Sequence, residues 1–326
     1  MKEKENGVKL GRVLALLLVI IAVQILSRLI ENIPLTIQLA YFVMNGAILA
    51  VFLAWLVPKI RLSRLSLVLL VWVELLVVEF LNNYVEAFFF TTRYNSAAVL
   101  APSLVSALVS SLIDAVASAL LVGYGTSRIT ASLGEYLSRR KSSAWILRIA
   151  TGSLAYFPIY FFFGMLITPF VLPYYNNSSF GLRIPSFAVL IPVELFRGFV
   201  YTLTVLPLLA TLAGGRTTRF AALASMLYIP GGLIPLLGNA TLPAPIIPFH
   251  GVEILADSIV YGLLLSRILS PPKSVSHPGV PRSRRQLPSI DAWVLKKPRN
   301  LNPRSNFRRP HQYLVSTSAR VGRLLG

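Results

Sequence analysis

The residues best suited to chemistry are an imidazole and two carboxylates, His250, Glu253 and Asp257, near the start of the last long apolar segment. Their spacing of three and then four residues places all three side chains on one face of a helix. The surrounding stretch, from about Ile246 to Leu269, is otherwise apolar enough to lie in a bilayer. Ionisable groups there normally face a protein interior or a wet cavity, so these three are the first candidates for a functional site.

Ionisable and amide side chains also interrupt two earlier apolar segments. Glu194 and Arg197 lie one helical turn apart, and Arg197 is the only basic residue well inside an apolar segment. Glu79, Asn82, Asn83 and Glu86 have the spacing of one helix face. Because a charged side chain at mid-bilayer costs about 2.5–3.5 kcal/mol, these groups predict a shared polar interior.

Two interpretations of this polar interior stay open. The groups can hold the helices together, with Arg197 paired to Glu194 in its own helix or to Glu253 or Asp257 across helices. They can instead line a pathway for protons, cations or a polar solute, because carboxylates and a histidine titrate and broken helices supply backbone groups to a site at mid-membrane. The candidate pathway residues are therefore His250, Glu253, Asp257, Glu194, Arg197, Glu79, Asn82 and Glu86.

The composition indicates the class of protein. The chain has 326 residues, of which 55% are hydrophobic and 13% charged, and its mean hydropathy is +0.68. A soluble domain carries about a quarter of its residues as charged side chains, so we expect a multi-pass membrane protein. The absence of cysteine excludes disulfides, thiolate metal sites and cysteine nucleophiles. With three histidines in the chain and one in a predicted span, we expect no cofactor and assign no metal.

The apolar segments predict an all-α bundle of about eight transmembrane helices in residues 1–269. Their approximate bounds are 13–29, 34–57, 65 to about 80 or 90, 98–122, 145–172, 187–212, 220–237 and 246–269. Pro158 and Pro169 predict that the fifth span is kinked or broken. Pro230-Gly231-Gly232 and Pro235 predict that the seventh span is discontinuous or re-entrant.

Basic residues alternate between the connections. The arm before the first span carries four Lys and Arg residues, and the second, fourth and sixth connections carry three, four and two, whereas the others carry one or none. By the positive-inside rule we expect a cell-membrane protein with both termini in the cytoplasm. The Asn-x-Ser/Thr sequences at Asn176, Asn177 and Asn239 all fall in connections that this rule assigns to the outside.

Residues 270–326 are predicted to form a separate cytoplasmic tail. After Ser270 there are twelve basic residues and one acid, Asp291. The richness in Pro, Arg and Ser predicts disorder, and the charge predicts contact with anionic lipid headgroups. Nucleic acid is the less favoured partner, because Trp293, Phe307 and Tyr313 are too sparse for a base-stacking platform.

Pro248-Phe249-His250-Gly251-Val252-Glu253, continued by Ile254-Leu255-Ala256, resembles the Pro-His-Gly-x-x-Glu-Leu-x-Ala signature of the stage II sporulation protein M family of integral membrane proteins. Phe80-Leu81-Asn82-Asn83 resembles the earlier Asn-Asn element of that family. The resemblance implies a role in envelope remodelling or in export-type complexes.

Glu194-Leu195-Phe196-Arg197-Gly198 resembles the end of the Glu-Glu-x-x-x-Arg-Gly motif of type II CAAX-protease-like membrane hydrolases, and His250 to Asp257 resembles a later histidine element. This resemblance implies an intramembrane hydrolase. Val193 stands where the first glutamate belongs, the Glu to Arg spacing is one residue short, and no second histidine lies in a span. These departures argue against a working hydrolase of this type.

The sequence therefore favours a non-enzymatic function, either a transporter or permease-like conduit or the membrane subunit of a larger transport or envelope complex. The chain has no Gly-x-x-x-x-Gly-Lys phosphate loop, so an ATPase partner would be a separate chain. The alternative is an intramembrane hydrolase, in which His250 with Glu253, Asp257 or Glu194 forms a metal or general-base site.

Overall fold

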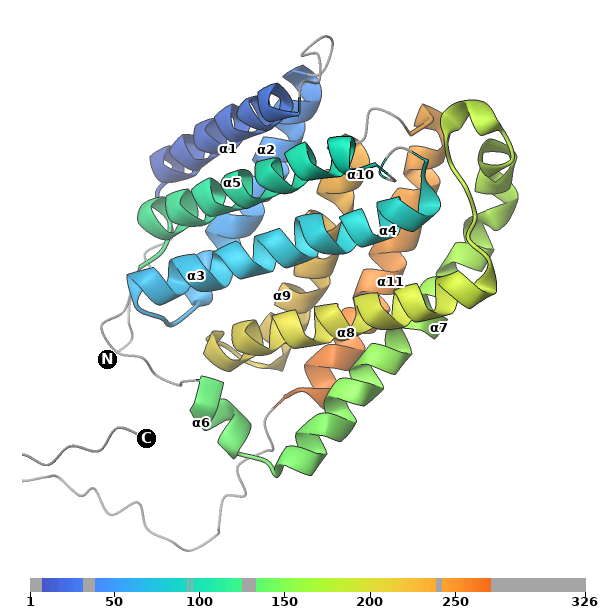
Figure 1. The fold of residues 1–326 in the computed structure, drawn as a ribbon. Helices are drawn as coiled ribbons and strands as arrows, with labels where there is room; N and C mark the ends of the chain where they lie inside the picture. Colours follow the sequence, from blue (N-terminus) through green and yellow to red (C-terminus); the bar gives the residue numbers. More distant parts are fainter. Residues whose placement is uncertain are drawn as a thin grey trace, which may run out of the picture. The chain divides into compact units, whose positions relative to one another are not determined.

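Helices make up the fold. The computed structural model describes residues 8–31, 39–92, 94, 96–124, 133–238 and 242–270, and within these ranges it contains no β-strand (Figure 1). Eight helical segments are long and apolar enough to cross a membrane, which confirms the predicted all-α transmembrane bundle. Apart from Ser270, the predicted basic tail lies outside the described residues, as do the first seven residues of the chain.

The eight segments have the lengths that a hydrocarbon core of about 30 Å requires. The α-helices are α1 (Leu10–Ile30), α2 (Leu39–Leu56), α3 (Arg64–Glu74), α4 (Asn82–Phe90), α5 (Ala97–Leu121), α6 (Leu133–Ser138), α7 (Ser142–Tyr175), α8 (Phe187–Thr211), α9 (Arg216–Tyr228), α10 (Ile234–Gly238) and α11 (Ile247–Ile268). Two π-helical segments join α-helices into single spans: η2 (Leu75–Leu81) lies between α3 and α4, and η5 (Ile229–Leu233) lies between α9 and α10.

Contacts between connections define one end of the bundle. Thr91, just past α4, pairs with Leu182 in an isolated β-bridge before α8. The guanidinium of Arg28, in the last turn of α1, donates to the backbone oxygen of Gly238 at the end of α10, at 2.7 Å. We call this the Thr91 end.

Three side chains bond to the last turn of α11 at the opposite end. The hydroxyl of Tyr136, in the short helix α6, donates to the backbone oxygen of Leu269, and Arg140 and Arg148 donate to the backbone oxygens on either side of it. Burial raises the pKa of Tyr136, so its hydroxyl keeps the proton that it donates. These bonds satisfy carbonyl groups that a helix end leaves without partners. We call this the Tyr136 end.

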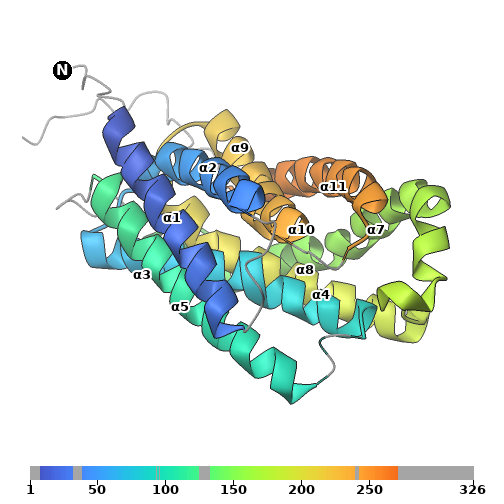
Figure 2. The same ribbon diagram turned by 90° about the horizontal axis from the view of Figure 1, so that it is seen from above.

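Glycines allow two pairs of helices, α7 with α8 and α9 with α11, to approach closely. α11 packs along both α7 and α9, and α7 also packs along α8 (Figure 2). A Cβ atom at Gly198 would lie 2.5 Å from the backbone oxygen of Ser153 and 2.5 Å from the Cβ of Tyr156. A Cβ atom at Gly262 would lie 2.8 Å from the backbone nitrogen of Ala224. Small residues at such contacts bring the backbones close enough for tight packing within a bilayer.

The fifth span was predicted to be kinked or broken and the seventh to be discontinuous or re-entrant, and neither span is broken. α7 is α-helical over 34 residues despite Pro158 and Pro169, and Figures 1 and 2 show that it bends in its second half. A proline removes one hydrogen bond and kinks a helix, which does not require a break. The expected break at Pro230-Gly231-Gly232 is also absent, because the chain passes through these residues as the π-helix η5.

Candidate functional site

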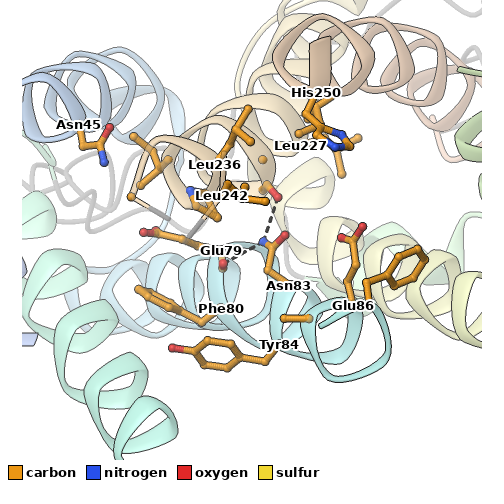
Figure 3. Close-up of a pocket in the computed structure, with 18 of the residues that line it drawn as sticks. Asn45, Glu79, Phe80, Asn83, Tyr84, Glu86, Leu227, Leu236, Leu242 and His250 are labelled. Atoms are coloured by element: carbon orange, nitrogen blue, oxygen red, sulfur yellow. Dashed lines mark hydrogen bonds between the residues drawn. The ribbon is translucent and has the colours of Figure 1, made fainter. Parts of the chain in front are cut away.

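The π-helical segments η2 and η5 pack against each other, and one side chain joins them (Figure 3). The amide nitrogen of Asn83 donates to the backbone oxygens of Gly231 at 2.9 Å, Glu79 at 2.9 Å and Val78 at 3.2 Å. A π-helical turn changes which backbone groups bond to each other. Backbone oxygens where the two segments meet therefore accept hydrogen bonds from this amide. Gly231 permits the approach, since a Cβ there would lie 3.1 Å from Cγ1 of Val78.

Arg197 in α8 is bonded to carboxylates of two helices. Its Nη1 lies 2.8 Å from Oε2 of Glu194 in the same helix, and its Nη2 lies 2.6 Å from Oε2 of Glu86 in α4. The side chain of Glu194 is fully buried, whereas that of Glu86 is 29% exposed. Glu194 therefore neutralises the guanidinium from the buried side, and Glu86 is its partner on the accessible side.

Two tyrosine rings of α7 flank the same guanidinium. The Cζ atom of Arg197 lies 5.6 Å from the ring centroid of Tyr156 and 5.6 Å from that of Tyr160. The hydroxyl of Tyr160 donates to Oε1 of Glu86 at 3.3 Å. Desolvated cation–π contacts of this kind contribute about 2 kcal/mol. Arg197 is thus held by groups from α4, α7 and α8.

A layer of tyrosines, Tyr156, Tyr201 and Tyr261, lies one turn closer to the Tyr136 end. The ring centroid of Tyr156 lies 5.3 Å from that of Tyr201 and 5.1 Å from that of Tyr261. The hydroxyl of Tyr261 lies 2.9 Å from Oγ1 of Thr202 and 3.1 Å from the backbone oxygen of Gly198. These contacts fix the tyrosine layer between α7, α8 and α11.

The predicted residues of α11 follow one face of that helix. Nδ1 of His250 lies 2.7 Å from Oε2 of Glu253, and the hydroxyl of Ser258 donates to Oδ1 of Asp257 at 3.3 Å. Nε2 of His250 is buried and has no hydrogen-bond partner among the described residues. Gly164 in α7 provides space for Glu253, because a Cβ at this glycine would lie 3.1 Å from Oε1 of Glu253.

These groups line a cavity of about 370 Å³ inside the bundle. Its described lining contains six carboxyl side chains and two guanidinium groups. The carboxyl groups are Glu31, Glu79, Glu86, Asp114, Glu253 and Asp257, and the guanidinium groups are Arg28 and Arg197. Cavities of this size with a few converging polar groups are typical of ligand sites.

The structure brings six of the eight predicted pathway residues to the cavity. The other two are Glu194, which lies behind Arg197, and Asn82, which is 1% exposed and outside the lining. Asn83, which helical spacing places on the same face as Glu79 and Glu86, lines the cavity.

The partner of Arg197 that sequence reasoning left open is now defined. Glu194 is one partner, and the partner across helices is Glu86. Glu253 and Asp257 bond instead to neighbours in their own helix.

Sequence reasoning did not select the tyrosines or Asn45. The spacing of Tyr156 and Tyr160 indicates one helix face. The segment around them is also rich in phenylalanine, however, and aromatic rings in a span are ordinary packing residues. The two tyrosines therefore did not stand out as site residues. Asn45 is a single amide in an apolar segment, and only the fold shows that it lines the same cavity.

The fold and the cavity define a multi-pass membrane protein with an acidic interior. Comparison with known proteins finds no family model, no curated protein and no solved structure that matches the chain. Among the residues that the structure describes, no three His, Asp or Glu side chains are grouped so that they could hold a metal ion.

Proposed function

We propose that this protein is a permease-like conduit that binds a small, positively charged solute in the acidic cavity. The observation that carries the proposal is the charge of the described lining, six carboxyl groups against two guanidinium groups. One of these two, Arg197, is already paired with Glu194 behind the lining. Buried carboxylates in excess need a positive partner, and the tyrosine rings around them also favour a cation.

The depth of the polar groups supports a cavity that is entered from the Thr91 end. His250 lies three residues into α11 and Asp257 lies ten residues into it, which corresponds to about 5 Å and about 15 Å along the helix. Glu86 lies four residues before the end of α4. The tyrosine layer lies beyond Asp257 and lines the cavity on the side of the Tyr136 end. Access from one side at a time is what a transporter with a site at mid-membrane requires.

We infer that the Thr91 end faces the outside of the cell and the Tyr136 end the cytoplasm. The described Lys and Arg residues of the connections gather at the Tyr136 end, where they include Lys59, Arg61, Arg64, Arg139, Arg140, Lys141, Arg216 and Arg219. This distribution follows the positive-inside rule and places both termini in the cytoplasm. There the basic tail expected from the sequence would meet anionic lipid headgroups.

Uptake by proteoliposomes that contain the full-length protein tests the conduit. The probes are radiolabelled tetramethylammonium and choline, which carry a permanent charge and do not leak through lipid. The expected result is saturable uptake by the wild type and an initial rate at least about tenfold lower for Asp257→Asn, because a buried charge partner is worth at least about 1.4 kcal/mol.

Glu74→Gln is the matched control. Glu74 is a buried carboxyl residue in α3 that does not line the cavity, so this variant should keep wild-type uptake. Equal thermal unfolding of the three proteins would show that each is folded. Uptake of both probes at the rate of protein-free liposomes contradicts the proposal.

The same cavity also suits the membrane subunit of a larger transport or envelope complex. The resemblance to the stage II sporulation protein M family favours this form of the proposal. Purification from native membranes in mild detergent, followed by mass spectrometry, distinguishes the two forms. A stoichiometric partner, such as an ATPase, supports the subunit, and a lone protein supports the self-contained conduit.

A hydrolase is the alternative function. The observation that favours it is the 2.7 Å contact between His250 and Glu253, which is within the range that general-base catalysis needs. The metal-dependent form predicts a bound divalent metal after purification and its loss in His250→Ala. A metal-free preparation by elemental analysis contradicts that form.

A further inference from the structure

The wall of the cavity that α1, α2, η2 and α5 form holds buried oxygen atoms that have no hydrogen-bond partner among the described residues. They are Oε2 of Glu79 in η2, Oδ1 of Asp114 in α5, Oδ1 of Asn45 in α2 and Oε1 of Gln24 in α1. All four residues line the cavity. The side chains of Glu79, Asp114 and Asn45 are 8%, 5% and 4% exposed, so three of the four are more than nine-tenths buried.

These atoms are all acceptors, and the two cavity guanidinium groups form bonds elsewhere. Arg197 is bonded to Glu86 and Glu194. Arg28 donates to the backbone oxygen of Gly238. A buried carboxylate without a donor is strongly unfavourable, so this set of oxygens is suited to a positively charged occupant.

We propose that Glu79 and Asp114, together with the amide oxygens of Asn45 and Gln24, bind a monovalent metal cation, separately from the solute bound near Arg197 and Asp257. Oxygen ligands are the set that hard cations prefer. The described residues contain no group of three or more His, Asp or Glu side chains, the kind of ligand set that tightly bound divalent ions usually have, so we assign a monovalent ion. The hydroxyl of Ser110 lies on the same wall and donates to the backbone oxygen of Ser106, which leaves its own oxygen able to accept.

A metal cation explains this wall better than protons do. Two of the four unpartnered oxygens belong to amides, which ligate cations but do not take up protons near neutral pH. Glu79 itself lies in the π-helical segment η2, where its span departs from regular α-helix without breaking. This inference rests on the proposed conduit in one respect only, namely that the bound cation is the coupling ion of the conduit.

Thermal unfolding of the purified full-length protein in lipid nanodiscs tests the cation site. Chloride and ionic strength are held constant while sodium or potassium replaces N-methyl-D-glucamine. We expect sodium or potassium to raise Tm in a saturable manner, because an ion that binds only the folded state stabilises it. Glu79→Gln and Asp114→Asn should weaken the apparent affinity about tenfold or more, since the charge of the ligands sets the affinity.

Two further variants keep the test decisive. Glu74→Gln removes a buried carboxyl group outside the cavity and should keep the wild-type response. If a charge variant does not fold, Asn45→Ala removes one ligand oxygen without changing charge and should weaken the response. An unfolding temperature that is the same in all three salts overturns the cation site. A wild-type cation response in both Glu79→Gln and Asp114→Asn also overturns it.

The uptake assay separates this inference from the proposed function. A cation-dependent Tm without uptake of tetramethylammonium or choline leaves the cation site standing and contradicts the conduit. Uptake that is the same in all three salts, with no cation effect on Tm, supports the conduit and overturns the cation site.

Discussion

Arg197 in α8 contacts side chains of α4 and α7 as well as Glu194 of its own helix. We predict that Arg197→Gln lowers the free energy of unfolding by about 3–5 kcal/mol, because it leaves Glu194 buried without a positive partner. Thermal or denaturant unfolding in detergent measures the change.

Tyr160→Phe is the control for that variant. It removes one long hydrogen bond, at 3.3 Å, to the partly exposed Glu86 and keeps the aromatic ring beside Arg197. The expected loss is about 1 kcal/mol or less. If Arg197→Gln is as stable as Tyr160→Phe, the ion pair does not hold the helices together.

The candidate site could be predicted from the sequence only in part. The residue types were informative, because ionisable groups in apolar segments stand out, and the face shared by His250, Glu253 and Asp257 follows from helix geometry alone. The contact between Glu86 and Arg197 could not be predicted, because it depends on how two separate helices pack.

At the scale of elements, the junction of η2 and η5 is where two spans depart from regular α-helix. We predict that Asn83→Ala lowers the free energy of unfolding by about 1–3 kcal/mol, because it removes the donor shared by three backbone oxygens. Hydrogen exchange should accelerate in Leu75–Leu81 and Ile229–Leu233 before it does in the rest of the bundle.

Asn83→Asp sharpens that experiment. It keeps the shape of the side chain but replaces the donor with an acceptor that faces the same oxygens, so it should be less stable than Asn83→Ala. Equal hydrogen exchange in wild type and both variants would show that the amide does not hold the junction.

The contact between α7 and α8 depends on a glycine. We predict that Gly198→Ala destabilises the protein by about 1–3 kcal/mol, since the added methyl group would clash with the backbone of Ser153. Gly251→Ala is the matched control, because a Cβ there would meet only Cδ2 of Leu236 at 3.7 Å and would favour the helix. A similar Tm for the two variants contradicts the close packing.

Sequence patterns located one of the two irregular elements, η5, without giving its conformation. Pro230-Gly231-Gly232 marked the position of η5, but a broken helix and a π-helical turn satisfy the same residues. Nothing in the apolar run from Leu75 to Leu81 marks a π-helix, and helical spacing alone did not show which of Asn82 and Asn83 faces the cavity.

At the scale of the whole molecule, the absence of cysteine makes topology directly measurable. We predict that a membrane-impermeant maleimide labels Ser178→Cys on intact cells and labels Ser143→Cys only after permeabilisation. Both serines are exposed, the first at the Thr91 end and the second at the start of α7. The wild-type chain is the unlabelled control, and the reverse pattern contradicts the proposed orientation.

The number of spans was predictable because the thickness of the bilayer fixes the length of an apolar helix. Eight such segments were expected, and the structure has eight. The cavity was not predictable in the same way, since its lining comes from helices spread over most of the described chain. Hydropathy indicates whether a helix can lie in lipid, but it carries no information about which helices are neighbours.

The bonds from Tyr136, Arg140 and Arg148 to the last turn of α11 give that helix one clamped end. His250 and Glu253 lie near its other end. A rigid rod held at one end swings about that point and moves most at its far tip. A tilt of α11 about its bonded end would therefore move His250 further than Tyr261. The acidic groups of α11 lie on the part of the helix that such a tilt displaces.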